Sequence, residues 1–518
     1  MPEHLLAVAI ERSSAEEFLA IKQDRPPALP EEEYRRFVDS DLWDLPSAPL
    51  RPLRGGGLRS EIAVGGADSV ADKLDLSSVD VDSALNQVLS QVGIAIAFIG
   101  KWTLLKHVEE PDFGPGAPVH TLFILGKLES EVESLQDSCK WLSKEIASKL
   151  LLEVTPNSDR IGPLVVTGLL HSSLETGKWR APHALHFQEY PPGVMLVPMR
   201  SRTQKPFRTT NLIVMVPNHD VNISENFGHI TAGDALLVDP GCCSQFHKEL
   251  ADLVAALPRK LVVFVTHHHN DHIDGLSVVQ RCNPDAILLA HTSTMNRIGK
   301  EMWSHGYTSI SGGENISIGG QRLEAIFAPG HTDGHLSLLH VSTNSLIVGD
   351  HCVGHGSAVL DVTSGGNMKD YFQTTYRFME LSPHALIPMH GRINLWPKRM
   401  LCGYLKHRRD RESLVMAAIE SGAETLYDIV SKVYADVDTK LWLAASFNVR
   451  VHVAHLAYQE KLPKDFSMKN FEATCGMRFL YRWAWGYLIS HTPTGIKVLA
   501  VIGATGFVLS FAVTRNLG

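Results

Sequence analysis

A histidine-rich loop that directly follows an apolar run constrains this chain more than any other feature. Residues 261–275 read LVVFVTHHHNDHIDG, so β-branched and apolar residues give way at once to polar ones. Such a run predicts a buried strand, which would hold the loop at its end rigidly. Within the loop, His267, His269, Asp271 and His272 satisfy the pattern H-x-H-x-D-H. Imidazole nitrogens and a carboxylate are the ligands that a catalytic zinc ion prefers.

The density of this motif predicts two metal ions rather than one. Neighbouring side chains point in different directions, so these four residues cannot all serve one tetrahedral ion that keeps an open position. Three later apolar runs also end in a ligand-type residue, at His331, Asp350 and His390. A lone histidine after a strand is more often a hydrogen-bonded loop residue than a ligand. These later residues therefore count as candidate ligands only because the dense motif accompanies them.

The order of five segments, LLVDPG, THHHNDH, APGHTDGH, IVGD and PMHG, resembles the metallo-β-lactamase superfamily. The resemblance implies an αββα sandwich in an α/β chain, with two Zn²⁺ ions per chain at one edge. It implies that one ion is held by His267, His269 and His331, and the other by Asp271, His272 and His390. Asp350 would bridge the ions. Asp239, in LLVDPG, would orient the ligand cluster without binding metal.

A two-zinc site of this kind implies hydrolysis by a hydroxide that bridges the metals. Asp271 or a nearby histidine would relay the proton to the leaving group. The segment GDHCVGHGSAVLD, residues 349–361, resembles that of the endoribonuclease group called β-lactamase-like protein 2, which has an acidic residue in place of His355. His355 is therefore a further candidate catalytic residue, and the difference bears on proton donation and on the choice of substrate.

Carboxy-terminal segments such as HRRDRE, IVSKVY and VAHLAYQ resemble the winged-helix-like appendage of the endoribonuclease group called β-lactamase-like protein 2. This implies cleavage of single-stranded RNA, with phosphates contacted by Lys406, Arg408, Arg409 and Arg411. A solvated helix face explains these charges equally well. The alternative functions are a small-ester or thioester hydrolase of the glyoxalase II kind, and a membrane-tethered binding protein without catalysis.

Residues 1–180 resemble a Nudix fold, an α+β domain, with residues 81–94 in the place of its signature helix. The catalytic signature is missing, because Asn86, Gln87, Ser90 and Gln91 stand where its Arg and Glu residues belong. Magnesium sites need carboxylate oxygens. We therefore expect a degenerate Nudix-like domain without diphosphatase activity.

The rest of the chain sets the domain limits and the expected compartment. The predicted domains are Nudix-like 1–180, metallo-β-lactamase 187–397 and winged-helix-like 398–465, followed by a tail, 466–518.

Seven cysteines without a C-x-x-C spacing favour a reducing, intracellular compartment, and we see no amino-terminal targeting signal. The uncharged run 498–513 predicts a transmembrane helix or a buried carboxy-terminal helix. In the first case the resemblance implies a mitochondrial membrane. The oligomeric state is left open.

Overall fold

The structure is a computed structural model, and it describes most of the chain. It covers residues 2–491 except 13–15, 31, 54–61, 65–77, 97–98, 130–134, 156, 171–181, 183–184 and 217–227. The chain divides into two compact units: residues 1–358 with 370–405, and residues 359–369 with 406–518. Each unit is described by itself.

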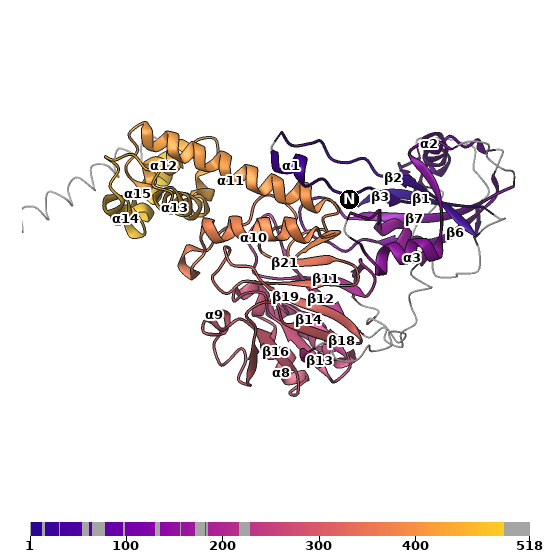
Figure 1. Cartoon of the computed structure of the whole chain (residues 1–518), viewed down its shortest axis with the longest axis horizontal. Coiled ribbons are helices and arrows are strands. Elements are labelled where there is room, and N and C mark those ends of the chain that lie inside the picture. The colour runs from indigo at the N-terminus through magenta and orange to yellow at the C-terminus, as the bar shows by residue number, and fades with distance from the viewer. Residues whose placement is uncertain are drawn as a thin grey trace, which may run out of the picture. The chain divides into compact units, whose positions relative to one another are not determined.

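The amino-terminal part of the first unit is built on a nine-stranded mixed sheet. Its path is β5-β6-β7-β1-β2-β3-β9, while β4 pairs with β1 and β8 pairs with β2. Figure 1 labels strands β1, β2, β3, β6 and β7 of this sheet. The strands are β1 (Glu3–Arg12), β2 (Glu17–Lys22), β3 (Leu42–Asp44), β4 (Ser47–Pro49), β5 (Ile62–Val64), β6 (Ile99–Glu109), β7 (Val119–Leu128), β8 (Cys139–Ser143) and β9 (Arg160–Ile161). The helical segments are α1 (Glu32–Arg36), α2 (Val81–Val92), α3 (Lys144–Leu152), α4 (Pro163–Val165) and the π-helical η3 (Val166–Leu170).

The helix expected at residues 81–94 is confirmed as α2. The Asp80 side chain accepts a hydrogen bond from the Ser83 N–H, and Gly93 ends the helix in the left-handed region at φ 71°. Its buried face packs on β1 and β7 in one apolar core. The Nudix resemblance of this part stays a prediction.

Buried Arg160 joins the amino-terminal part to the rest of the first unit. Its guanidinium donates to the carbonyl oxygens of Ser40, His384 and Leu395. Arg392 adds a second connection, because its Nε lies 2.6 Å from Oε1 of Glu110. These contacts fix the loops after residue 383, which carry His390.

The second part of this unit consists of two facing sheets. The seven-stranded sheet runs β10-β11-β12-β14-β15-β16-β17, and the six-stranded sheet runs β13-β18-β19-β20-β21-β22. The first contains β10 (Gln188–Glu189), β11 (Val194–Arg200), β12 (Thr209–Met215), β14 (Ala235–Val238), β15 (Leu261–Phe264), β16 (Ile287–Ala290) and β17 (Tyr307–Ser309). The second contains β13 (His229–Gly233), β18 (Asn315–Ile318), β19 (Gln321–Phe327), β20 (Leu336–His340), β21 (Ser345–Gly349) and β22 (Ala385–Pro388).

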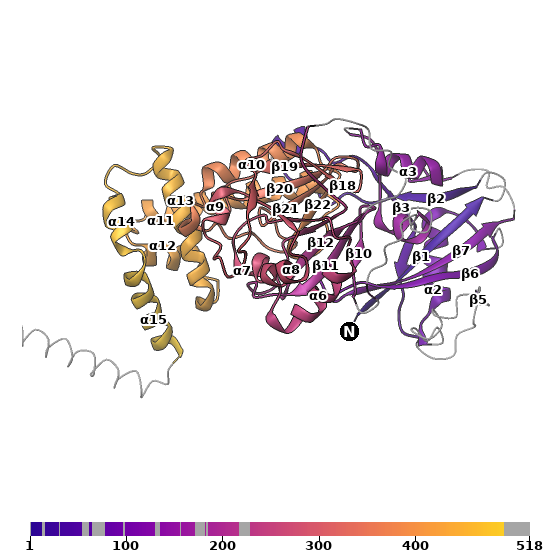
Figure 2. The same cartoon turned by 90° about the horizontal axis from the view of Figure 1, so that it is seen from below.

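An apolar core joins the two sheets face to face, with fully buried residues from both, such as Leu196, Val262, Leu338 and Ile347. The outer face of the seven-stranded sheet packs on α6 (His247–Ala256) and α8 (Leu276–Cys282) (Figure 2). Helix α10 (Met368–Leu381) lies beside β21 (Figure 1). This layering confirms the expected αββα sandwich. Shorter elements are η4 (Ser244–Phe246), α7 (Asn270–Ile273) and α9 (Thr292–Met295).

The described part of the second unit is helical, as expected from about residue 398. It contains η5 (Val362–Ser364) and the end of α11 (Pro397–Glu420), then α12 (Leu426–Val433), η6 (Thr439–Leu441), α13 (Trp442–Tyr458), α14 (Met468–Thr474) and α15 (Met477–His491). Buried apolar side chains of α11, α12, α13 and α15 form one core.

The expectation of a transmembrane helix is corrected. Among the described residues, no helix combines the length and the apolar character needed to cross a membrane. The run 498–513, on which that expectation rested, lies outside the described residues.

Candidate metal centre

The ends of five neighbouring elements place the candidate ligands. His267 and His269 follow β15, and Asp271 and His272 lie in the short helix α7. The other three follow β19, β21 and β22, at His331, Asp350 and His390 respectively. All seven positions were predicted from the sequence as candidate ligands.

Three ring nitrogens form a compact triangle. Nε2 of His267 lies 2.9 Å from Nδ1 of His269, and Nε2 of His331 lies 3.2 Å from each of these atoms. A tetrahedral zinc ion with Zn–N distances of about 2.0–2.1 Å would hold its nitrogens roughly 3.3 Å apart. The triangle therefore fits three ligands of one ion.

A second cluster combines Asp271, His272 and His390. Oδ2 of Asp271 lies 3.4 Å from Nε2 of His390, and Oδ1 lies 3.8 Å from Nε2 of His272. The Nε2 atoms of both histidines are buried and have no hydrogen-bond partner among the described residues. Buried polar atoms are seldom left unpaired, so these atoms fit metal ligands.

Asp350 lies between the two clusters. Its Oδ1 is 3.4 Å from Nε2 of His390, while its Oδ2 is 3.5 Å from Nε2 of His272 and 4.0 Å from Nε2 of His331. One carboxylate thus faces a histidine of the first cluster and two of the second, which is the arrangement of a bridging ligand.

The Asp239 carboxylate orients the ligand cluster through hydrogen bonds, which agrees with the role that the family resemblance implies. One carboxylate oxygen accepts from the backbone N–H of Thr266 over 2.7 Å, and the other from the Thr266 hydroxyl over 2.5 Å. Nδ1 of His272 lies 2.8 Å from Oδ2 of Asp239. An Nδ1–H donated to Asp239 leaves Nε2 of His272 as the metal-binding atom. Similarly, Nδ1 of His390 lies 2.9 Å from the carbonyl oxygen of Thr209.

Charge and burial both shift pKa values in this site, in the same direction at His267 and in opposite directions at His390 and Asp350. Burial lowers the pKa of His267 well below its usual value, and neighbouring histidines add to this effect. Burial would also lower the pKa of His390, but Asp350 and Asp271 raise it to about 9. Burial would raise the pKa of Asp350, yet His390 and His272 hold it well below its usual value. The metal-free site thus holds protons that bound cations would displace.

His335 was missed as a functional residue in the sequence. It is fully buried, and its Nε2 accepts a hydrogen bond from the backbone N–H of Asp350 over 3.1 Å. Its Nδ1 lies 3.0 Å from the carbonyl oxygen of Ala328. The second histidine of APGHTDGH was the available signal.

The predicted phosphate contacts need correction, because Arg408 is only 1% exposed. Nη1 of Arg411 donates to the carbonyl oxygen of Val433, and its guanidinium lies over the Tyr434 ring. Lys406 forms an ion pair with Asp410. Arg409 is partly buried, and its role stays a prediction. These side chains mainly pack and pair within α11 and its neighbours, so they do not form an exposed basic patch.

His355 lies exposed in the loop after β21. Among the described residues, it belongs to neither ligand cluster. Its catalytic role stays a prediction.

The comparisons agree with the geometry. Residues 228–390 match the family described as the metallo-beta-lactamase superfamily. This part of the chain is a metallo-β-lactamase superfamily domain. Residues 425–465 match the beta-lactamase associated winged helix domain, so the predicted winged-helix domain is also confirmed.

Similar proteins include two curated relatives named β-lactamase-like protein 2 homolog. The one from Drosophila melanogaster is 24% identical over 44% of this chain and 80% of its own length. The one from Caenorhabditis elegans is 25% identical over 46% of this chain and 78% of its own length. A crystal structure of a β-lactamase domain protein from Burkholderia ambifaria is 19% identical, covers 56% of this chain and 94% of its own, and has a TM-score of 0.46.

Proposed function

We propose that this metallo-β-lactamase domain holds two zinc ions and cleaves single-stranded RNA. The position of Asp350 between two ligand clusters supports the number of ions. Imidazole and carboxylate donors of this kind suit zinc. When bound, two such ions would polarise a phosphoryl oxygen and lower the pKa of a water from 15.7 to about 7.

The chain's own residues supply positioning and proton transfer. Asp239 and Thr266 fix the ring of His272, and His335 fixes the backbone of Asp350. Rigid placement of this kind stabilises a transition state without reorganisation of the site. The side chain of Asp271 is 16% exposed, and we assign it the transfer of a proton to the leaving group.

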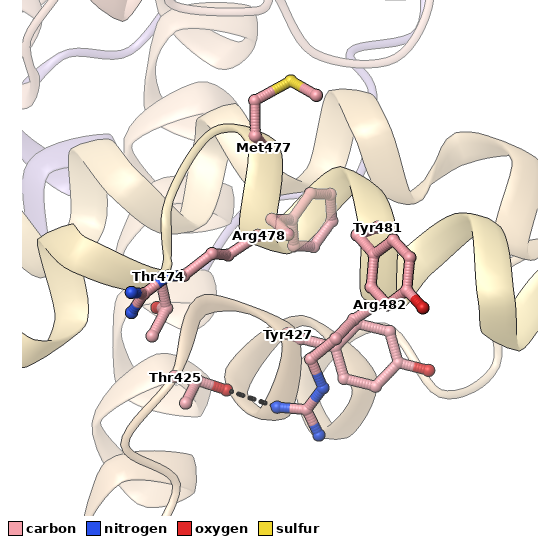
Figure 3. A pocket seen from close by; sticks show the side chains of 8 residues that line it. Thr425, Tyr427, Thr474, Met477, Arg478, Tyr481 and Arg482 are labelled. Carbon is pink, nitrogen blue, oxygen red and sulfur yellow. Dashed lines mark hydrogen bonds between the residues drawn. The ribbon is translucent and has the colours of Figure 1, made fainter. Parts of the chain in front are cut away.

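RNA as the substrate is supported by the second unit. A pocket of about 510 Å³ lies among α12, α14 and α15, where Tyr427, Arg478, Tyr481 and Arg482 are among its lining residues (Figure 3). Arg482 donates to the Thr425 hydroxyl and pairs with Asp428. Tyr481 is 71% exposed and Arg478 is also exposed. An exposed aromatic ring beside an arginine is the combination that stacks bases and contacts phosphates in single strands.

The two curated relatives carry the name of the β-lactamase-like protein 2 group, and resemblance to this group implies RNA cleavage. The following experiment tests RNA as the substrate. The full chain is stripped of metal with a chelator, reloaded with zinc, and given a labelled single-stranded RNA and, separately, a thioester. We expect cleavage of the RNA only after reloading. Thioester hydrolysis without RNA cleavage would overturn RNA as the substrate, whereas the proposal that the domain is a hydrolase would stand.

A further inference from the structure

Three histidines outside the metal centre lie on adjacent strands of the amino-terminal sheet. His4 on β1 pairs with His120 on β7 in parallel register. Glu109 on β6 pairs with His120 in antiparallel register, and His107 precedes Glu109 by two positions. Side chains of directly paired residues share a face, as do those of alternate residues along a strand. All four side chains therefore lie on one face of the sheet.

The rings of these histidines are close enough to share a ligand. One ring nitrogen from each of His4, His107 and His120 lies within 4.8 Å of the other two. The rings of His4 and His120 meet edge to face at 5.5 Å between centroids, and those of His107 and His120 at 5.9 Å. Nδ1 of His4 is buried and has no hydrogen-bond partner among the described residues. A buried ring nitrogen without a partner is unfavourable unless something binds it.

We propose that His4, His107 and His120 form a separate site for a divalent late transition metal ion, such as Zn²⁺. Neutral imidazole is the preferred protein ligand of zinc, copper and nickel. Three nitrogens leave a fourth position for water or a carboxylate. An ion would draw the three nitrogens to roughly 3.3 Å from one another, since Zn–N bonds are about 2.0–2.1 Å long.

The charges around the trio favour a cation over an anion. Glu109 is the direct strand neighbour of His120, so a bound anion would face its carboxylate. Glu110 is already engaged, because it pairs with Arg392 and accepts from the backbone N–H of Val119. The site lies where three strands are joined, and a bound ion would therefore stabilise the amino-terminal sheet.

Counting bound ions tests this site without measuring turnover. The full chain, stripped by chelator, is dialysed against Zn²⁺ and its zinc is measured by atomic emission. We expect His120→Asn to bind one ion fewer than the original chain. The control His305→Asn changes an exposed histidine and should bind the original number. Equal ion counts in His120→Asn and the original chain would overturn the site.

A crystal of the original chain grown with zinc decides the question if His120→Asn does not fold. An anomalous peak at the zinc edge among the three rings supports the site. A map with peaks at the metal centre but none among these rings overturns it, even where the metal centre is occupied as proposed.

Discussion

His335 accepts a hydrogen bond from the backbone N–H of Asp350, the residue that lies between the two ligand clusters. Burial lowers the pKa of His335 to about 3, so its ring is neutral and Nε2 remains an acceptor at neutral pH. Gly349 allows this contact, because a Cβ there would lie 2.3 Å from Nε2 of His335. Gly349, the small residue before Asp350, thus leaves room for the ring that holds the Asp350 backbone.

Gly349→Ala should displace His335, loosen Asp350 and weaken zinc binding. Gly349 also has φ 58°, which disfavours alanine. We expect a loss of about 1–3 kcal/mol in the free energy of unfolding, as for other overpacked sites, measured by urea denaturation. Gly313→Ala is the matched control, with φ 96° but no atom within 4 Å of an added Cβ. Equal zinc affinities in the two variants would contradict the role of His335.

Asp239→Asn should weaken zinc binding by about 10–100-fold, the usual effect of losing a partner of a ligand histidine. An amide cannot accept from Thr266 and His272 at both ends. Competition with a chromogenic chelator measures the affinity. Asp252→Asn, which changes an exposed carboxylate, should leave the affinity unchanged, and an unaltered affinity in Asp239→Asn would refute the orienting role.

The sequence predicted the candidate ligands because most of them follow an apolar strand, and these strand ends meet at one edge of the sandwich. Asp239 was predicted from the family resemblance of LLVDPG alone, and the structure places it against His272. His335 was missed because its contact with the backbone N–H of Asp350 depends on the fold, and the second histidine of APGHTDGH was the only hint in the sequence. Arg408 was misjudged for a related reason: its charge suggested exposure, whereas the packing of α11 buries it.

A rise in pH should destabilise the metal-free fold and strengthen zinc binding. The pKa of His390 is raised to about 9 in the metal-free fold, from an unperturbed value of about 6.5. Protonation of His390 therefore stabilises the metal-free fold fully below about pH 6.5, and this stabilisation is lost as pH rises through 9. Zinc needs the unprotonated nitrogen, so zinc affinity should rise over the same interval.

Two measurements check this pH dependence. The melting temperature of the chelator-treated chain should fall between pH 6.5 and 9, and zinc affinity from competition titrations should rise. A zinc affinity that does not change over this interval would contradict the exchange of protons for metal.

Tyr481→Ala should weaken the binding of single-stranded RNA by about 1–3 kcal/mol, the usual value of one stacked base. Fluorescence anisotropy with a labelled RNA measures this loss. Tyr458→Ala removes another exposed tyrosine of the second unit, 63% exposed, and should bind RNA normally. If both variants bind like the original chain, the pocket among α12, α14 and α15 does not contact the substrate.

We propose that Asp350 joins two metal ions into one hydrolytic centre, and the variant Asp350→Ala removes that connection. Zinc content and RNA cleavage are measured on the same sample, with Asp252→Ala as the control. Loss of several kcal/mol of transition-state stabilisation by the metals should lower turnover roughly 10³-fold. The variant should also bind less zinc. An Asp350→Ala chain that keeps two zinc ions and the original turnover would show that Asp350 does not join the metals into a hydrolytic centre.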